Sequence, residues 1–274
     1  MPIGGIMDRI AIISDVHGNI VALESVLDDI KKRGINKIFC LGDSIFKCNH
    51  PDLVVDRLKE VCEVILIGNS DEAICNPNVK NKNFWTRNIL GEERVEYLYN
   101  LPKSHEFYMS GHLIRLFHAS PYSLIDVFNP MYKPDIELFN KPMIYNPDRL
   151  FDNTEFIGKS SFDKTPDIVC YGHIHTPLIL RHKNKTILNP GSIGIPTEMS
   201  NEDINSPDNK FSTLSSYMII EGDFESTKLS GISFQLVRIP YDVSAVITEL
   251  ENSDMPNKKI VIQTLKSAIP TTYN

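Results

Sequence analysis

Short polar motifs follow five apolar segments of the chain, and each contains a residue that could bind a metal ion. These candidate ligands are Asp15, His17, Asp43, Asn69, His118, His173 and His175. A mixture of carboxylates and imidazoles suits manganese, iron or zinc better than calcium or magnesium. Seven ligands are too many for one tetrahedral site, but they suit two ions that share a carboxylate. Two such ions can activate water and stabilise an in-line phosphoryl displacement, so the set predicts hydrolysis of phosphate esters or anhydrides.

None of these motifs is distinctive by itself. Asp15-x-His17 is an everyday spacing, and a lone histidine such as His118 is more often a satisfied core residue. The inference depends on the motifs occurring together, in order, and each after an apolar run. Glycines in four of them, Gly18, Gly42, Gly68 and Gly172, allow the tight turns and the close backbone approach that an anion site needs.

The elements that would position these residues alternate between strand and helix. Residues 9–15, 37–42 and 64–68 are short, β-branched apolar runs, typical of buried strands. Residues 19–33 and 52–61 have apolar side chains at helical spacing. This β-α-β-α-β order predicts a parallel sheet that is covered on both faces. Sites form at the carboxyl ends of such strands, which is where the polar motifs stand.

The remaining two thirds of the chain is more varied. Residues 121–161 contain scattered prolines and aromatics and predict a cap-like surface insertion, with a short helix near 147–157. Elsewhere we expect a helix over 84–98, strands over 112–118, 167–172, 177–182, 186–189, 216–221 and 232–239, a polar loop over 201–209, and helices over 243–251 and near the C-terminus. One domain, 1–274, would contain all of these elements.

Composition narrows the classes of function. The 274 residues carry a formal net charge of −7, which argues against binding long nucleic acids. Small phosphates remain possible partners because bound metal ions would supply positive charge. We expect a cytoplasmic protein, because the five cysteines form no CxxC pair and the sequence has neither a signal-like leader nor an apolar run of membrane length. We expect it to be a monomer or a homodimer.

The ordered motifs resemble those of the calcineurin-like metallophosphoesterase superfamily. That family has D-x-H, G-D, G-N-H-[DE], a lone His and G-H-x-H in this order. Here the sequence has DVH at 15–17, GD at 42–43, GNSD at 68–71, His118 and GHIH at 172–175. The resemblance covers about residues 9–194. The forms DVHGN and NPGSIG (189–194) are similar to the small bacterial branch of YfcE-like enzymes and diadenosine tetraphosphate hydrolases.

The resemblance implies an α/β fold, a four-layer αββα sandwich of two mixed sheets with an irregular insertion. It also implies that Asp43 bridges two divalent ions, with manganese favoured over iron or zinc, and that a metal-bridging hydroxide attacks phosphorus. Asn19 would face the substrate phosphate. Asp15, His17 and His175 would bind one ion, Asn69, His118 and His173 the other, and Asp43, Asn69 and Asp71 would be the catalytic residues.

One departure from the family pattern concerns the leaving group. Many members have a histidine, thought to protonate the leaving group, where this chain has Ser70. A serine hydroxyl is a poor general acid at neutral pH, and Asp71 would have no histidine to orient. The change favours good leaving groups, such as those of nucleotide polyphosphates or activated aryl esters. His50 could substitute, although a solvated His50 is the favoured interpretation, and Lys47 could contact a distal phosphate.

The substrate is the open part of the prediction. Aromatic residues near the predicted site could stack on a nucleobase, although packing of the insertion onto the body is the favoured explanation. We expect a nucleotide such as a dinucleoside polyphosphate. The alternatives are a protein or small-molecule phosphomonoesterase and a non-catalytic scaffold that retains the fold. The aromatic residues concerned are Phe84, Trp85, Tyr122, Phe128, Tyr132, Phe139 and Tyr145.

Overall fold

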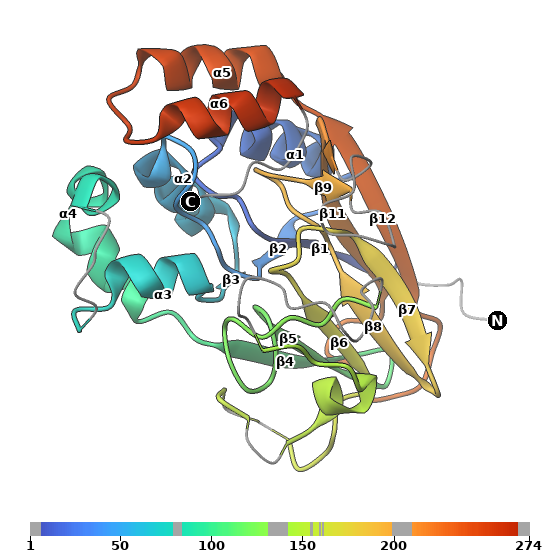
Figure 1. The fold of residues 1–274 in the computed structure, drawn as a ribbon. Helices are drawn as coiled ribbons and strands as arrows, with labels where there is room; N and C mark the ends of the chain where they lie inside the picture. Colours follow the sequence, from blue (N-terminus) through green and yellow to red (C-terminus); the bar gives the residue numbers. More distant parts are fainter. Residues whose placement is uncertain are drawn as a thin grey trace.

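Two five-stranded mixed sheets form the centre of the molecule (Figure 1). The structure, a computed structural model, describes residues 7–78, 84–130, 142–153, 156–158, 160, 162–198 and 210–267. The order of the strands within each sheet differs from their order along the chain, so segments that are distant in sequence become neighbours. The predicted α/β fold with two mixed sheets is confirmed.

The first sheet has the order β12-β11-β1-β2-β3. Its three N-terminal strands are parallel, as the sequence predicted, and β11 and β12 add in antiparallel orientation. The strands are β1 (Asp8–Ile13), β2 (Lys37–Cys40), β3 (Val64–Ile65), β11 (Leu214–Gly222) and β12 (Ser233–Pro240).

The second sheet has the order β4-β5-β6-β8-β7. Its three central strands are parallel and its two edge strands are antiparallel to their neighbours. The strands are β4 (Ser104–Met109), β5 (His112–Phe117), β6 (Ile168–Tyr171), β7 (Leu178–His182) and β8 (Lys185–Asn189). A separate pair, β9 (Thr197–Glu198) and β10 (Lys210–Phe211), lies outside both sheets.

The alternation of side chains along β1 shows how the layers stack. Ile10 and Ile12 pack in the core between the two sheets, together with residues of β4, β5 and β6. Ala11 and Ile13 point the other way, into the core beneath the helices. Both faces of β1 are therefore buried, which explains why its sequence is apolar throughout.

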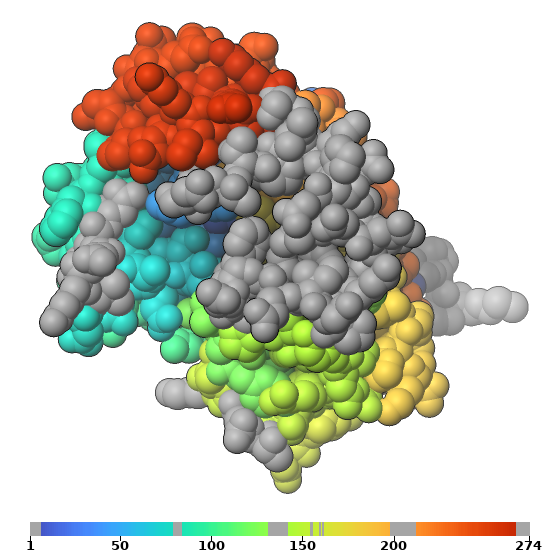
Figure 2. All heavy atoms as spheres, viewed as in Figure 1, coloured from blue at the N-terminus to red at the C-terminus, as the bar shows by residue number. Residues whose placement is uncertain are grey.

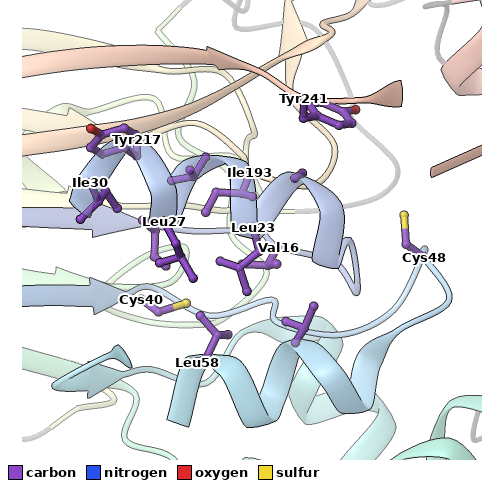
Figure 3. Packing of buried hydrophobic residues seen from close by; sticks show 14 of the residues in the cluster. Val16, Leu23, Leu27, Ile30, Cys40, Cys48, Leu58, Ile193, Tyr217 and Tyr241 are labelled. Atoms are coloured by element: carbon purple, nitrogen blue, oxygen red, sulfur yellow. The ribbon is translucent and has the colours of Figure 1, made fainter. Parts of the chain in front are cut away.

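Four helices cover the outer face of the first sheet. α1 (Ile20–Lys32), α2 (Pro51–Val61), α5 (Val243–Asn252) and α6 (Lys258–Ser267) contribute to one apolar cluster. Figure 3 shows Leu23, Leu27 and Ile30 of α1 within it, with Leu58 of α2 nearby. The spacing of these α1 residues is the helical spacing visible in the sequence. Two further helices, α3 (Asn69–Cys75) and α4 (Phe84–Tyr99), pack against each other beside this layer.

The outer face of the second sheet is covered by an irregular layer. Phe128, Ile144 and Phe151 pack on Val169 and Tyr171 of β6. Within this layer, the predicted helix near 147–157 is a shorter 3-10 helix, η1 (Pro147–Phe151). Figure 2 shows α5 and α6 at one end of the molecule and yellow-green residues of the 121–161 segment at the other. Residues 131–141, 154–155, 159 and 161 of that segment, with Tyr132 and Phe139, lie outside the described residues, as does the predicted loop 201–209.

Four elements were missing from the sequence prediction. α3 and β4 are short and lack a clean apolar period in the sequence, and β9 and β10 have two residues each. In the part of the chain that the structure describes, no helix has the length and apolar character needed to cross a membrane.

Candidate metal centre

Five strands, three from one sheet and two from the other, place their polar carboxyl ends around one point. The ligand atoms of Asp15, His17 and His175 lie within 4.8 Å of one another. Those of Asp15, Asp43 and His118 form a second group within the same limit. Side chains separated by as many as 158 residues in sequence are thereby brought together. The two groups share Asp15, and Asp43 also faces both of them, as its contacts show below.

The backbone at the site adopts an uncommon conformation. Asp15, His17, Asp43, His173 and His175 have φ angles of 54°, 52°, 53°, 68° and 59°, in the left-handed region. Few residues other than glycine adopt this conformation, and its concentration at one place is typical of a functional site.

Glycines allow the loops after β2 and β3 to approach each other closely. A Cβ atom on Gly68 would lie 2.2 Å from the backbone nitrogen of Asp43, and one on Gly42 would lie 2.5 Å from that of Gly68. Any other residue at either position would push the two loops apart. Asp43 and Asn69 therefore lie in adjacent loops because both positions are glycine.

Backbone carbonyls fix the orientation of three imidazoles. Because a carbonyl can only accept a hydrogen bond, each contacting Nδ1 carries the proton and each Nε2 is left as a free electron pair facing the cluster. The contacts are His17 Nδ1 to Ile45 O at 3.3 Å, His118 Nδ1 to Leu41 O at 2.9 Å and His175 Nδ1 to Ile195 O at 2.9 Å. This is the orientation that metal-binding histidines require.

The free imidazole nitrogens face electron-rich neighbours instead of protons. His17 Nε2 lies 3.0 Å from His175 Nε2, and His118 Nε2 lies 3.0 Å from Asn69 Oδ1. The fourth histidine, His173, lies with its ring 5.2 Å from that of His118, centroid to centroid. Such a concentration of ligand atoms could hold a metal ion.

The pKa shifts of Asp15 and His17 are also compatible with a bound cation. Burial is the largest cause acting on His17 and lowers the pKa of its imidazole, which is therefore neutral. Burial acts to raise the pKa of Asp15, but contacts with the surrounding imidazoles, His175 foremost, hold that pKa well below its ordinary value. Asp15 Oδ2 accepts a hydrogen bond from the backbone of His173, whereas Oδ1 has no hydrogen-bond partner among the described residues. A buried carboxylate oxygen with no donor suits a metal ligand.

Asp43 has one oxygen towards each group of histidines. Oδ2 lies 3.7 Å from His17 Nε2, and Oδ1 lies 3.5 Å from His118 Nε2. Ser70 holds both oxygens: its backbone N–H donates to Oδ1 and its hydroxyl donates to Oδ2, each at 2.8 Å. This role of Ser70 has no signal in the sequence, where the residue is notable only as a departure from the family pattern.

Asp71 binds the backbone of two site loops. Its carboxylate accepts from the N–H groups of Ser44, Ile45 and Gly68 at 3.1, 3.2 and 2.9 Å. Burial, with the nearby charge of Asp43 as the next cause, raises the pKa of Asp71 to about 7. Asp71 therefore lies behind the cluster and ties the Asp43 loop to the start of α3.

The predicted substrate contacts have different environments. Asn19 Oδ1 caps α1 by accepting from Ala22 N, and its Nδ2 donates to Gly194 O, both at 3.0 Å. This arrangement favours an architectural role for Asn19. Lys47 lies near the cluster: burial lowers its pKa, while the charges of Asp43 and Asp15 act to raise it.

His50 is oriented away from the cluster. Its Nε2 lies 3.1 Å from Glu249 Oε2 on α5, and the pair is half-buried. The structure thus does not bring His50 into the place of the missing histidine.

The 189–194 turn supports the two ligand loops from behind. Ser192 Oγ donates to Asp15 O, and Asn189 Nδ2 donates to Gly172 O, both at 2.7 Å. The backbone of Gly194 donates to Asp15 O at 3.0 Å. These contacts make the 189–194 turn a support for the ligand loops.

Comparisons with known proteins agree with this geometry. Residues 8–205 match the model of the calcineurin-like phosphoesterase superfamily domain. The uncharacterized protein MJ0912 of Methanocaldococcus jannaschii is 27% identical over 277 residues, covering 92% of this chain and 95% of that protein.

Two solved structures share the fold over almost their full length. A metallophosphoesterase from Sphaerobacter thermophilus has a TM-score of 0.62 at 23% identity, covering 96% of this chain and 99% of that one. The hypothetical protein PH1004 from Pyrococcus horikoshii OT3 has a TM-score of 0.62 at 16% identity, covering 94% and 98%. The family model matches most of this chain, and the clustered side chains could hold divalent ions. The chain therefore belongs to the calcineurin-like phosphoesterase superfamily and is a metal-dependent phosphoesterase.

Proposed function

We propose that this phosphoesterase hydrolyses a small nucleotide with a good leaving group, such as a dinucleoside polyphosphate, using two divalent ions, with manganese favoured. Asp15, His17 and His175 bind one ion in this proposal. Asn69, His118 and His173 bind the other, and Asp43 bridges them. The supporting observation is Asp43 itself, whose two oxygens face imidazoles of the two separate groups at 3.7 and 3.5 Å.

Bound ions of this kind lower the pKa of water and stabilise charge on a reacting phosphoryl group. The protein's own residues have two further tasks. Asp43 and Asp15 balance the charge of the ions, and the carbonyls behind His17, His118 and His175 keep the free nitrogens aimed inward.

Lys47 is the proposed phosphate contact. The charges of Asp43 and Asp15 both act on the pKa of its ammonium, which places the positive charge in the neighbourhood of the cluster. A nucleoside polyphosphate carries a second phosphoryl group next to the reacting one, and Lys47 would bind that group. Asn19, occupied by α1 and Gly194, shapes the loop instead.

Ser70 supports the preference for good leaving groups. Its hydroxyl donates to Asp43 Oδ2 at 2.8 Å, so it is engaged elsewhere and has an unsuitable pKa for a general acid. A leaving group must then depart as a stable anion. Nucleotide and activated aryl groups meet this condition, whereas alkyl alcohols do not.

The described aromatic residues do not add to the nucleotide argument. Phe128 is buried against the second sheet, and Tyr122 donates its hydroxyl to Arg149 O and Asp152 Oδ2. Trp85 donates to Asp254. These three rings pack the structure together, the favoured interpretation from the sequence, whereas Phe84 and Tyr145 are exposed. The nucleotide proposal therefore depends on leaving-group chemistry.

Metal analysis and a substrate screen test the proposal. Protein purified without chelator should contain about two equivalents of transition metal per chain. With added manganese, dinucleoside polyphosphates and bis-p-nitrophenyl phosphate should be cleaved faster than p-nitrophenyl phosphate and a phosphopeptide. Cleavage of the phosphopeptide alone would make the protein a phosphomonoesterase. Absence of metal and of turnover on every substrate would favour a scaffold.

A matched pair of variants tests the bridge. Asp43→Asn keeps the size of the side chain but removes the charge shared by both ions, so turnover should be abolished. Asp29→Asn is the control, because Asp29 is a half-buried carboxyl that pairs with Arg33 and Tyr217 outside the cluster. Retained turnover in Asp43→Asn would refute the bridging role.

A further inference from the structure

Ser70 contacts both oxygens of one carboxylate. Its backbone N–H donates to Asp43 Oδ1 and its hydroxyl to Asp43 Oδ2, each at 2.8 Å. Both Ser70 and Asp43 are buried. We propose that Ser70 is a positioning residue that fixes the plane of the Asp43 carboxylate and so sets how this carboxylate is divided between two ions. The inference depends on the two-ion function proposed above.

The division follows from the positions of the histidines. Oδ1, held by the Ser70 amide, is the oxygen 3.5 Å from His118 Nε2. Oδ2, held by the Ser70 hydroxyl, is the oxygen 3.7 Å from His17 Nε2. Rotation about the last bond of the Asp43 side chain would break both hydrogen bonds at once. One residue thus fixes each oxygen beside a different imidazole.

The two contacts of Ser70 are separable by mutation. Any residue at position 70 supplies the amide, which is fixed by the first turn of α3, so Oδ1 stays bound. Only a side-chain hydroxyl supplies the contact to Oδ2. Removing the hydroxyl leaves only the amide contact to oppose rotation of the carboxylate, and the ion nearest His17 should lose affinity.

This role also separates Ser70 from the leaving group. A hydroxyl that donates its single proton to Asp43 cannot donate the same proton to a departing oxygen. Ser70 acts through Asp43, so its removal should slow all substrates by a similar factor, regardless of the leaving group. A general acid would show the opposite, since its loss is felt most by the poorest leaving group.

The experiment compares Ser70→Ala, Ser70→Thr and Ser216→Ala with the wild-type protein. Thr retains a hydroxyl and should rescue. Ser216 is a buried serine on β11 whose hydroxyl has no hydrogen-bond partner among the described residues, so Ser216→Ala is the matched control. Circular dichroism checks the fold of each variant, and calorimetric titration with manganese(II) into metal-free protein gives the affinities and the stoichiometry.

Ser70→Ala should weaken binding of one of the two ions by about 10- to 100-fold, the usual effect of losing a contact behind a metal ligand. Ser70→Thr and Ser216→Ala should bind manganese like the wild type. With saturating manganese, kcat/KM of Ser70→Ala should fall equally for diesters with p-nitrophenyl and phenyl leaving groups.

Two results would overturn the inference. Unchanged manganese affinity in Ser70→Ala would show that the hydroxyl does not position Asp43. A loss that is several-fold larger for phenyl than for p-nitrophenyl would make Ser70 a proton donor. Failure of the proposed function looks different, because the wild-type protein itself would then bind fewer than two ions.

Discussion

The pair between Arg115 and Glu106 offers a stringent test of the fold away from the metal centre. Both side chains are fully buried, and Arg115 Nε lies 2.7 Å from Glu106 Oε1. The same guanidinium donates to Asp152 O at 3.0 Å and to Asn153 Oδ1 at 2.6 Å. The pair therefore joins β4 and β5 to the 121–161 segment, and Glu106→Gln perturbs it with little change of size.

The expected effect of Glu106→Gln is large. The substitution leaves the Arg115 charge buried without its countercharge, and breaking a buried pair in this way costs about 3–5 kcal/mol. The free energy of unfolding, measured by urea titration, should fall by that amount. Glu63→Gln is the control, because Glu63 is 52% exposed and pairs with Lys37 at the surface, where a salt bridge contributes about 0–1 kcal/mol.

The two losses in free energy of unfolding are compared to test whether the Arg115 charge is left unpaired. A loss in Glu106→Gln as small as that in Glu63→Gln would refute the reasoning, because it would mean that water or another group neutralises Arg115. An intact fold with a normal slope of the urea transition would show that the reference state is unchanged.

Three further outcomes are expected. Asp71→Asn places an amide N–H against backbone donors of Ser44 or Gly68, so both stability and kcat should fall, the latter by about 10- to 100-fold, in urea titrations and diesterase assays. Manganese at 100 times its dissociation constant should add about 2.7 kcal/mol per site to the free energy of unfolding, and Asp15→Ala should lose most of this gain, as thermal unfolding with and without manganese would report. Hydrogen bonds from Arg94 lower the pKa of Asp56, so this pair stabilises the protein above pH 3.8, the ordinary value, and the contribution is lost as the pH falls through the lower folded-state pKa. Because the pair is partly exposed, Asp56→Asn should reduce stability by less than about 1 kcal/mol at pH 7, and by progressively less in acid, as urea titrations at several pH values would measure.

Much of the fold is visible in the sequence because burial is periodic. β1 is apolar at every position from Ile10 to Ile13 since it has a core on each face. α1 repeats its apolar residues every three or four positions since only one face is buried. Such patterns predicted the parallel strands and their helices, whereas the two mixed sheets were implied by the family resemblance of the ordered motifs.

Long-range neighbours are invisible in the same sequence. Nothing local predicts that β11 adds to β1 in antiparallel orientation, because the pairing joins residues about two hundred positions apart. The same holds for Ser192, whose hydroxyl binds the carbonyl of Asp15 at 2.7 Å. α3 escapes prediction because it has seven residues, too few to show a period.

In the candidate site too, the sequence predicted some features and not others. Residue types and order pointed to the seven candidate ligands, and the structure gathers them at one edge. The roles of Ser70 and Asp71 depend on hydrogen bonds from backbone to carboxylate across 27 residues of sequence, such as Ser44 N to Asp71 and Ser70 N to Asp43. A motif records which residue is present and not which atoms it contacts.

Five residues of the site have a left-handed backbone conformation that other contacts must stabilise. Each such conformation costs about 1–3 kcal/mol, so an arrangement with five of them persists only if other contacts hold it. Those contacts come from the backbone itself: Asp15 N donates to Gly42 O and His17 N donates to Asp43 O, each at 3.0 Å. The backbone of the first ligand loop is therefore held by the backbone of the second, through atoms that are not candidate metal ligands.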